Sequence, residues 1–162
     1  MNSSPYLYQI NASRGGVPKN SVLEAWVSTE GLHGDAHRNK VLHGGPDRAI
    51  CLFSLEVIEA LQREGHTIFP GASGENFTLA GLDWKHLQPG DHLKLGEDVH
   101  LEVTSFCEPC RRNAQWFQKG DYSRIAQGQH PGWSRLYARV LSEGLVQQGD
   151  RVWVETPSER IR

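Results

Sequence analysis

The chain has 162 residues, a formal net charge of −2 and 22% charged residues. A chain of this length can bury about two thirds of its unfolded surface in one core, so we expect a single domain over 1–162, with its core at about 8–154 and a flexible tail at 156–162. The low net charge argues against a general nucleic-acid or membrane surface, and the longest apolar run, Ala49–Phe53, is too short to cross a bilayer. The odd number of cysteines favours a reducing compartment, which predicts a cytoplasmic protein.

Short alternating or apolar segments, separated by Gly, Pro, Asn and Asp, predict a mainly β fold. The expected strands are Tyr6–Ile10, Val22–Ser28, Arg48–Phe53, His92–Leu95, Val99–Thr104 and Val152–Glu155. A helix is expected from the Ser54 cap to Gly65, because Leu55, Ile58 and Leu61 share one helical face. Trp133–Leu141 fits a helix or a strand. We predict a strand, which turns Arg135 and Arg139 to one side.

Polar residues concentrate in glycine-rich loops of the first half. The loop Ser13–Lys19 is flanked by two cations, Arg14 and Lys19, and has backbone N–H groups that could meet a phosphate. The stretch 31–48 contains four potential ligands for a divalent metal and one cation, Arg48, that could clamp a phosphate or carboxylate. The four potential ligands are His33, Asp35, His37 and His43. Solvated or hydrogen-bonded histidines are the alternative. Gly74–Thr78 adds the carboxylate of Glu75 and the amide of Asn76 after another glycine turn.

Cys107 and Cys110 form a Cys-x-x-Cys at the end of a predicted strand. Pro109 suits the first position of a helix running to about Gln118, which would put Cys110 in the first turn. Free backbone N–H groups, the helix dipole and two following arginines would then favour a thiolate there. Structural zinc, a redox pair and simple packing are the alternatives. A structural zinc site needs two more ligands, and the chain has no second Cys-x-x-Cys. A redox pair would need a βαβ pattern around it, which the strand-rich flanks do not supply.

Six segments, in order, resemble the MOSC domain, a family named after the C-terminal domain of molybdenum-cofactor sulfurase. They are Ser13–Lys19, Gly34–His37, His43–Ala49, Gly74–Thr78, Pro109–Cys110 and Gly132–Arg135. The resemblance runs from about Tyr8 to Val154. It implies a MOSC-type β-barrel with a few covering α-helices, and binding of the pyranopterin molybdenum cofactor. The cysteine of the family's Pro-Cys motif, here Cys110, is the protein ligand to molybdenum in the reductase branch.

The resemblance also implies a reaction and roles for the polar residues. The reaction is the reduction of N-hydroxylated compounds, N–OH to N–H. The chain lacks a nicotinamide fingerprint and the cysteines for an iron–sulfur cluster, so a separate flavin or iron–sulfur reductase should supply electrons. Asp35 or His37 could relay protons. The candidates for the cofactor phosphate are Arg14, Arg48 and Arg135, and those for the pterin are His37, His43 and Asn76.

Two other functions stay open at this point. In the first, Cys110 holds a persulfide or delivers a cofactor without turnover, as a carrier would. In the second, the histidines and aspartate of 33–43 form a metal-dependent hydrolase that needs no cysteine.

Overall fold

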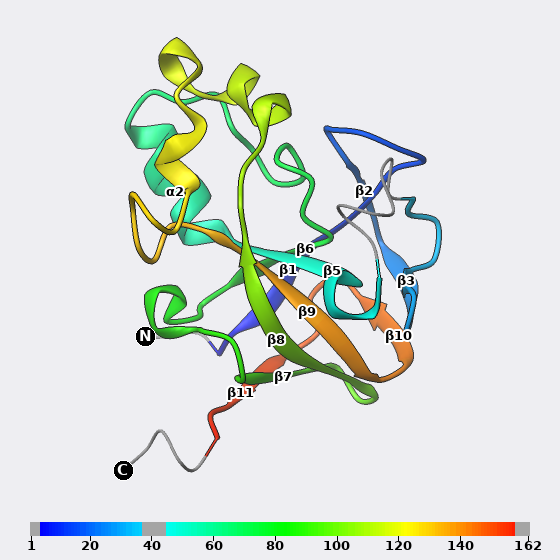
Figure 1. Ribbon diagram of the computed structural model, residues 1–162. Coiled ribbons are helices and arrows are strands. Elements are labelled where there is room, and N and C mark those ends of the chain that lie inside the picture. The colour runs from blue at the N-terminus through cyan, green and yellow to red at the C-terminus, as the bar shows by residue number, and fades with distance from the viewer. Residues whose placement is uncertain (1–3, 37–44, 158–162) are drawn as a thin grey trace.

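The computed structural model describes residues 4–36 and 45–157, so the predicted site residues His37 and His43 lie outside the described residues (Figure 1). The strands are β1 Tyr6–Ala12, β2 Asn20–Val22, β3 Glu24–Ser28, β4 Gly31–Leu32, β5 Ile50–Ser54, β6 Phe77–Ala80, β7 His92–Leu95, β8 Val99–Cys107, β9 Arg135–Ser142, β10 Gly144–Gln147 and β11 Val152–Glu155. The α-helix is α2, Leu55–Arg63. Short 3-10 helices are η1 Pro46–Arg48, η2 Trp84–His86, η3 Arg111–Trp116, η4 Gln118–Gly120 and η5 Tyr122–Ile125.

The strands form an eight-stranded sheet and a three-stranded sheet. The larger sheet has the order β11-β7-β8-β9-β5-β6-β1-β2, and the smaller one has the order β10-β3-β4. All neighbours are antiparallel except β5 and β6, which are parallel. Within the described ranges the edge strands β2 and β11 do not pair with each other, so the sheet is open and the expected closed barrel is not confirmed. Hydrogen bonds between Leu7 and the segment 149–150 do bring β1 beside the approach to β11.

The core lies between the sheets and α2. Apolar residues of the strands are fully buried there, among them Leu7 and Ile10 of β1 and Phe77 of β6. The predicted helix after Ser54 is confirmed. Ser54 Oγ accepts a hydrogen bond from Val57 N–H, which supplies a partner for a free N–H of the first turn. The mainly β architecture with few helices is therefore as expected.

The strand predictions are confirmed at His92–Leu95 and Val152–Glu155, and Trp133–Leu141 does contain a strand, β9. The single strand predicted over Val22–Ser28 is wrong. It is two strands, β2 and β3, which pair with β1 and β10 respectively. Leu23 between them is 76% exposed, because the chain leaves one sheet there and enters the other.

Two element starts also differ from the prediction. The strand expected from Arg48 begins at Ile50, because Pro46–Arg48 forms a 3-10 turn. The helix expected from Pro109 to about Gln118 is instead the six-residue 3-10 helix η3, and Cys110 is its extended N-cap residue at φ −124°. Cys110 is therefore not in the first turn of an α-helix, and the helix-dipole argument for its thiolate loses its structural basis.

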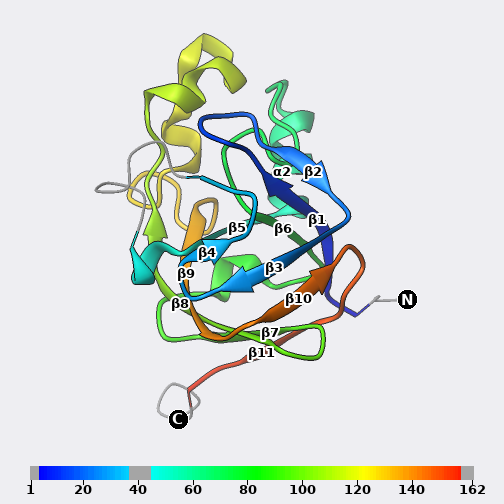
Figure 2. The same cartoon turned by 90° about the vertical axis from the view of Figure 1, so that its right-hand side faces the viewer.

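The helical segments gather at one end of the molecule. Figures 1 and 2 show α2 and η3–η5 together at that end, with β7 and β11 at the opposite end. The strand β8 runs between the two ends, from Val99 to Cys107. No helix in the described ranges is long and apolar enough to cross a bilayer.

Candidate functional site

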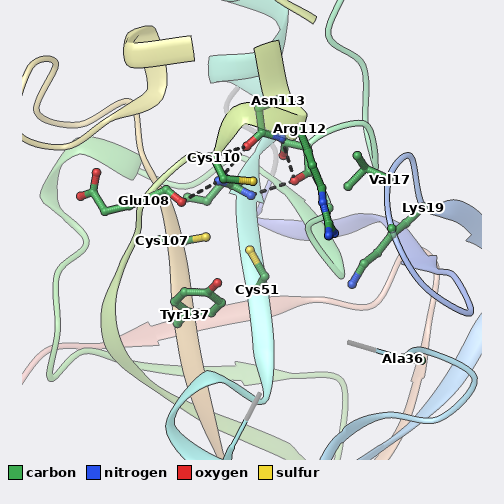
Figure 3. Close-up of a pocket in the computed structure, with 14 residues that line it drawn as sticks. Val17, Lys19, Ala36, Cys51, Cys107, Glu108, Cys110, Arg112, Asn113 and Tyr137 are labelled. Carbon is green, nitrogen blue, oxygen red and sulfur yellow. Dashed lines mark hydrogen bonds between the residues drawn. The ribbon is translucent and has the colours of Figure 1, made fainter. Parts of the chain in front are cut away.

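A pocket opens where β8 runs into η3, and all three cysteines of the chain line it (Figure 3). Its walls come from the 13–19 loop, the 70–76 loop, β5, β9 and the 107–113 segment. The lining residues are Gly16, Val17, Lys19, Ala36, Cys51, Ser73, Gly74, Cys107, Glu108, Cys110, Arg112, Asn113, Arg135 and Tyr137. Loops far apart in sequence thus meet around three thiols. None of the three cysteines is in a disulfide.

Cys51 and Cys107 form a buried thiol pair at the base of this pocket. They pack with Tyr137 of β9, the strand that lies between β5 and β8 in the sheet. The side chains of Cys51 and Cys107 face each other in Figure 3. A hydrogen bond from the Cys51 thiol lowers the pKa of Cys107 to about 6 against the opposing effect of burial, and the Arg135 guanidinium lowers it further. The same hydrogen bond, with burial, raises the pKa of Cys51 well above its ordinary value. Cys107 is therefore the more acidic thiol of the pair.

Arg135 is a buried cation in the pocket wall, with 5% of its surface exposed. Its Nη1 donates to Ser73 O at 2.8 Å, and its Nη2 donates to Glu108 O and to Asn113 Oδ1, each at 3.3 Å. Its Nε is buried without a hydrogen-bond partner among the described residues. Burial opposes its charge, but the neighbouring Cys107 sulfur keeps the pKa of Arg135 raised. The guanidinium thus keeps its positive charge while its hydrogen bonds go to neutral oxygens.

Asn113 connects the exposed Cys110 to this wall. Its Oδ1 accepts the backbone N–H of Cys110 at 3.3 Å and also Nη2 of Arg135. Its Nδ2 donates to Ser73 O at 3.2 Å. The backbone of Cys110 is therefore held at the pocket while its side chain is exposed to solvent.

Lys19, rather than Arg14, brings the charge of the 13–19 loop to the pocket. Arg14 is exposed and does not line it, whereas Lys19 does. Lys19 Nζ lies 2.8 Å from Asp35 Oδ2, and both side chains are largely buried. Asp35 also accepts hydrogen bonds from Ser13 N–H and from Asn76 Nδ2. Its two oxygens are occupied by three donors, so Asp35 anchors the loop and positions Lys19. Its proton relay stays a prediction.

Asn76 and Arg48, both predicted to bind cofactor, lie outside the pocket lining. Asn76 is fully buried, and its side-chain oxygen accepts the N–H of Cys51 at 2.9 Å. With its Nδ2 on Asp35, its amide links β5 to the 13–36 region. Arg48 is exposed, and its guanidinium carbon lies 5.4 Å from the ring centroid of Tyr137. It therefore lies beside Tyr137, the residue that packs with the thiol pair.

The 70–76 loop is anchored by Glu75, a buried carboxyl group. Burial raises the pKa of Glu75, and it accepts hydrogen bonds from Gly71 N–H and from the hydroxyls of Ser73 and Thr78. Because Ser73 O receives both Arg135 and Asn113, Glu75 fixes the acceptor on which these two side chains depend.

The described residues of 33–43 do not form the metal-ligand cluster that the hydrolase alternative requires. Within 4–36 and 45–157, neither His33 nor Asp35 belongs to any group of three potential metal ligands. Asp35 is also turned to Lys19 and Asn76.

The sequence analysis missed Cys51, Asn113 and Tyr137 of the pocket, and it noted Lys19 only as a cation of the 13–19 loop. Asn113 had a detectable signal, since a polar residue three positions after an N-cap can return a hydrogen bond to it. Cys51 had none, because it lies in an apolar run that predicts only a buried strand.

Comparison with known proteins places the chain among proteins of the same architecture. It superposes on the crystal structure of YiiM from Geobacillus stearothermophilus with a TM-score of 0.73 and 26% identity, covering 93% of this chain and 75% of that one. It is 36% identical over 124 residues to YflK of Bacillus subtilis, covering 74% of this chain and 53% of YflK. It is 29% identical over 132 residues to a protein named Reductase of Gibberella moniliformis, covering 78% of this chain and 23% of that protein.

The shared region is therefore a part of these relatives. The chain spans about half the length of YflK and less than a quarter of the Gibberella moniliformis reductase. The family model of the MOSC domain matches residues 39–153, which include β5 to β10, the three cysteines and Arg135. The chain belongs to the MOSC domain family.

Proposed function

We propose that this MOSC domain binds the pyranopterin molybdenum cofactor at Cys110 and reduces N-hydroxylated compounds with electrons from a separate protein. The observation that carries the proposal is the pairing of an exposed thiol, Cys110, with a buried cation, Arg135, in one pocket. Family membership and a relative named Reductase support it. The free thiols also support our proposal that the protein works in the cytoplasm, where thiols stay reduced.

The residues of the pocket fit such a group. Molybdenum in a dithiolene is a soft metal, and a cysteine sulfur is the soft protein ligand that suits it. The cofactor carries a phosphate, and the unpartnered Nε of buried Arg135 is a donor that an anion would complete. Lys19 adds a second cation to the lining of the pocket. When bound, the cofactor would supply the two-electron chemistry of R₂N–OH + 2H⁺ + 2e⁻ → R₂N–H + H₂O.

The chain's own residues would hold and orient the reactants. Asn113 fixes the backbone of Cys110, so the sulfur is presented from a restrained position. Lys19 Nζ, hydrogen-bonded to Asp35, is a proton donor that lines the pocket, and Asp35 would act through it. The predicted roles of Arg14, His37, His43, Arg48 and Asn76 toward the cofactor stay predictions.

The test is a comparison of Cys110→Ser with Cys107→Ser in protein made by a host that synthesises the cofactor. We expect Cys110→Ser to abolish reduction of an N-hydroxylated base by reduced viologen dye under anaerobic conditions, while Cys107→Ser keeps part of it. A hydroxyl is a much poorer ligand for a soft metal than a thiolate. Molybdenum and pterin content are measured in each protein. Full activity of Cys110→Ser would refute the ligand assignment.

The same protein distinguishes the reductase from a carrier. We expect turnover with the viologen dye, none with NADH or NADPH alone, and nicotinamide-driven turnover once a flavin or iron–sulfur reductase is added. Bound sulfane sulfur without molybdenum, or full molybdenum occupancy without turnover from any donor, would favour the carrier. Sustained turnover by the pure chain with NADH would refute the separate donor.

A further inference from the structure

A second group of potential ligands lies on the outer face of the sheet, at the end opposite the cysteine pocket. His92 of β7 is directly opposite Glu155 of β11, and His100 lies on β8, the other neighbour of β7. The intervening Leu93 is fully buried, so the alternation of β7 directs His92 outward. His100 and Cys107 are seven residues apart on β8, roughly 23 Å at the usual rise of a strand. The two sites are therefore separate.

The three side chains already converge. His92 Nδ1 and His100 Nε2 are 3.1 Å apart, and one ligand atom from each of His92, His100 and Glu155 lies within 4.8 Å of the others. Two nitrogens bound to one tetrahedral zinc ion at its usual bond lengths are about 3.3 Å apart. The imidazoles thus have nearly the spacing of two zinc ligands, and a carboxylate oxygen of the exposed Glu155 lies within 4.8 Å of both.

The local charges permit a cation at this position. Glu102 is the direct partner of His92 on β8, so His92 has a carboxylate on each neighbouring strand. The nearby cations are Lys94, the direct partner of His100 on β7, and Arg139 of β9. Lys94 Nζ lies 6.0 Å from the ring centroid of Trp153, and Arg139 pairs with Asp47 and Glu102.

We propose that His92, His100 and Glu155 form a binding site for Zn²⁺ or a similar borderline divalent cation. Two imidazole nitrogens and one carboxylate oxygen match zinc better than calcium or magnesium, which favour all-oxygen sites. Three protein ligands leave a fourth position for water. The ion would join three adjacent strands, including β11 at the edge of the sheet, so it would stabilise the fold at the end remote from the cysteines.

A hydrogen bond between the two histidines is the competing explanation. It would account for the 3.1 Å distance with one ring donating and the other accepting. It makes no demand on Glu155, whereas a metal ion does. Substitution of Glu155 therefore separates the two explanations.

The experiment is a calorimetric titration of metal-free protein with Zn²⁺, made on wild type and on His92→Ala, His100→Ala and Glu155→Gln. The matched control is His86→Ala, which removes an exposed histidine that also has a carboxylate partner, Asp83. A Cys110→Ser protein tests whether zinc binds at the thiols instead. Thermal unfolding with and without Zn²⁺ provides a second measurement, and unfolding without metal shows that each variant folds.

We expect one Zn²⁺ per chain at this site and a rise in melting temperature on binding. Each of the three ligand variants should bind Zn²⁺ at least roughly 10-fold more weakly. A loss of that size is typical even when the mutated residue only orients a metal ligand. His86→Ala and Cys110→Ser should bind as wild type does. Unchanged binding in His92→Ala or His100→Ala would overturn the proposal. Binding lost only in Cys110→Ser would do the same, as would wild-type affinity in Glu155→Gln.

Discussion

The buried side chains of Cys51 and Cys107 face each other at the base of the pocket, and their interaction lowers the pKa of Cys107 and raises the pKa of Cys51. The two residues are 56 positions apart in the chain. They meet because β9 lies between β5 and β8 and the pair packs on its Tyr137. Under the exposed Cys110 there is thus a buried thiol with a lowered pKa, to which the Arg135 guanidinium contributes.

Replacing Cys51 should raise the pKa of Cys107. Cys51→Ala removes the donor that contributes most to lowering that pKa to about 6. The ultraviolet absorbance of the thiolate is followed against pH in Cys110→Ser and in Cys51→Ala/Cys110→Ser. We expect the midpoint near pH 6 in the first protein to move up by at least one unit in the second, a difference of about 1.4 kcal/mol per unit. An unchanged midpoint would contradict the role of Cys51.

Stability should depend on pH through Cys107. Its pKa is lower in the folded protein, about 6, than in an unfolded chain, where a cysteine has a pKa of about 8.5. The folded state therefore releases this proton first. The stabilisation is complete above about pH 8.5 and is lost as pH falls through about 6. The free energy of unfolding of wild type, measured with urea, should rise across this window relative to Cys107→Ser. Parallel curves would show that Cys107 is not ionised in the folded protein.

Arg135 should contribute far more to stability than Arg139 on the same strand. Arg135 is buried and donates to three acceptors, whereas Arg139 forms ion pairs at an exposed position, with 42% of its side chain exposed. Arg135→Met should lower the free energy of unfolding by about 2–4 kcal/mol, because buried acceptors lose charged donors. Arg139→Met should cost less than about 1 kcal/mol. Equal losses in urea unfolding would mean that burial does not distinguish them.

Asp35 should act as a structural anchor of the 13–19 loop. Its carboxylate is only 3% exposed and pairs with Lys19. Breaking a buried ion pair typically costs about 3–5 kcal/mol, so Asp35→Ala should lower the free energy of unfolding by about that amount. The control is Asp83→Ala, which removes an exposed carboxylate that pairs with His86 and should cost less than about 1 kcal/mol. A loss below about 1 kcal/mol in Asp35→Ala would remove its anchoring role.

Gly71 should tolerate no side chain, because the 13–19 loop lies against it. Its φ is +90°, and a Cβ there would lie 2.5 Å from Lys19 O. Gly149 has a similar φ of +95°, and a Cβ there would meet none of the described residues within 4 Å. Gly149→Ala should cost about 1–2 kcal/mol from backbone strain alone, and Gly71→Ala clearly more. Equal melting temperatures of the two variants would show that the loop moves away without cost.

The sequence alone determined the mainly β character, the helix after Ser54, the strand with Arg135 and the family. Each of these depends on local information. The alternation in His92–Leu95 and the cap at Ser54 involve residues within a few positions of one another. The family motifs are short segments in a fixed order along the chain, so they identify Cys110 and Arg135 as candidates without any knowledge of long-range contacts.

The tertiary structure decided which groups share the pocket and how their pKa values are shifted. Cys51 has no local signal and acquires its role only because β9 pairs with β5 on one side and with β8 on the other. In the 13–19 loop, the ion pair with Asp35 holds Lys19 at the pocket, whereas Arg14 does not line it. Asn76 was predicted to bind the pterin because its amide can donate and accept hydrogen bonds. In the structure, both ends of that amide are hydrogen-bonded within the protein, to Cys51 and Asp35. Hydrogen bonds, desolvation and charge act through space over a few ångströms, whereas a sequence pattern describes only neighbours along the chain. For this reason local motifs predict elements well, whereas the partners of Lys19, Cys51 and Asn76 depend on how those elements pack.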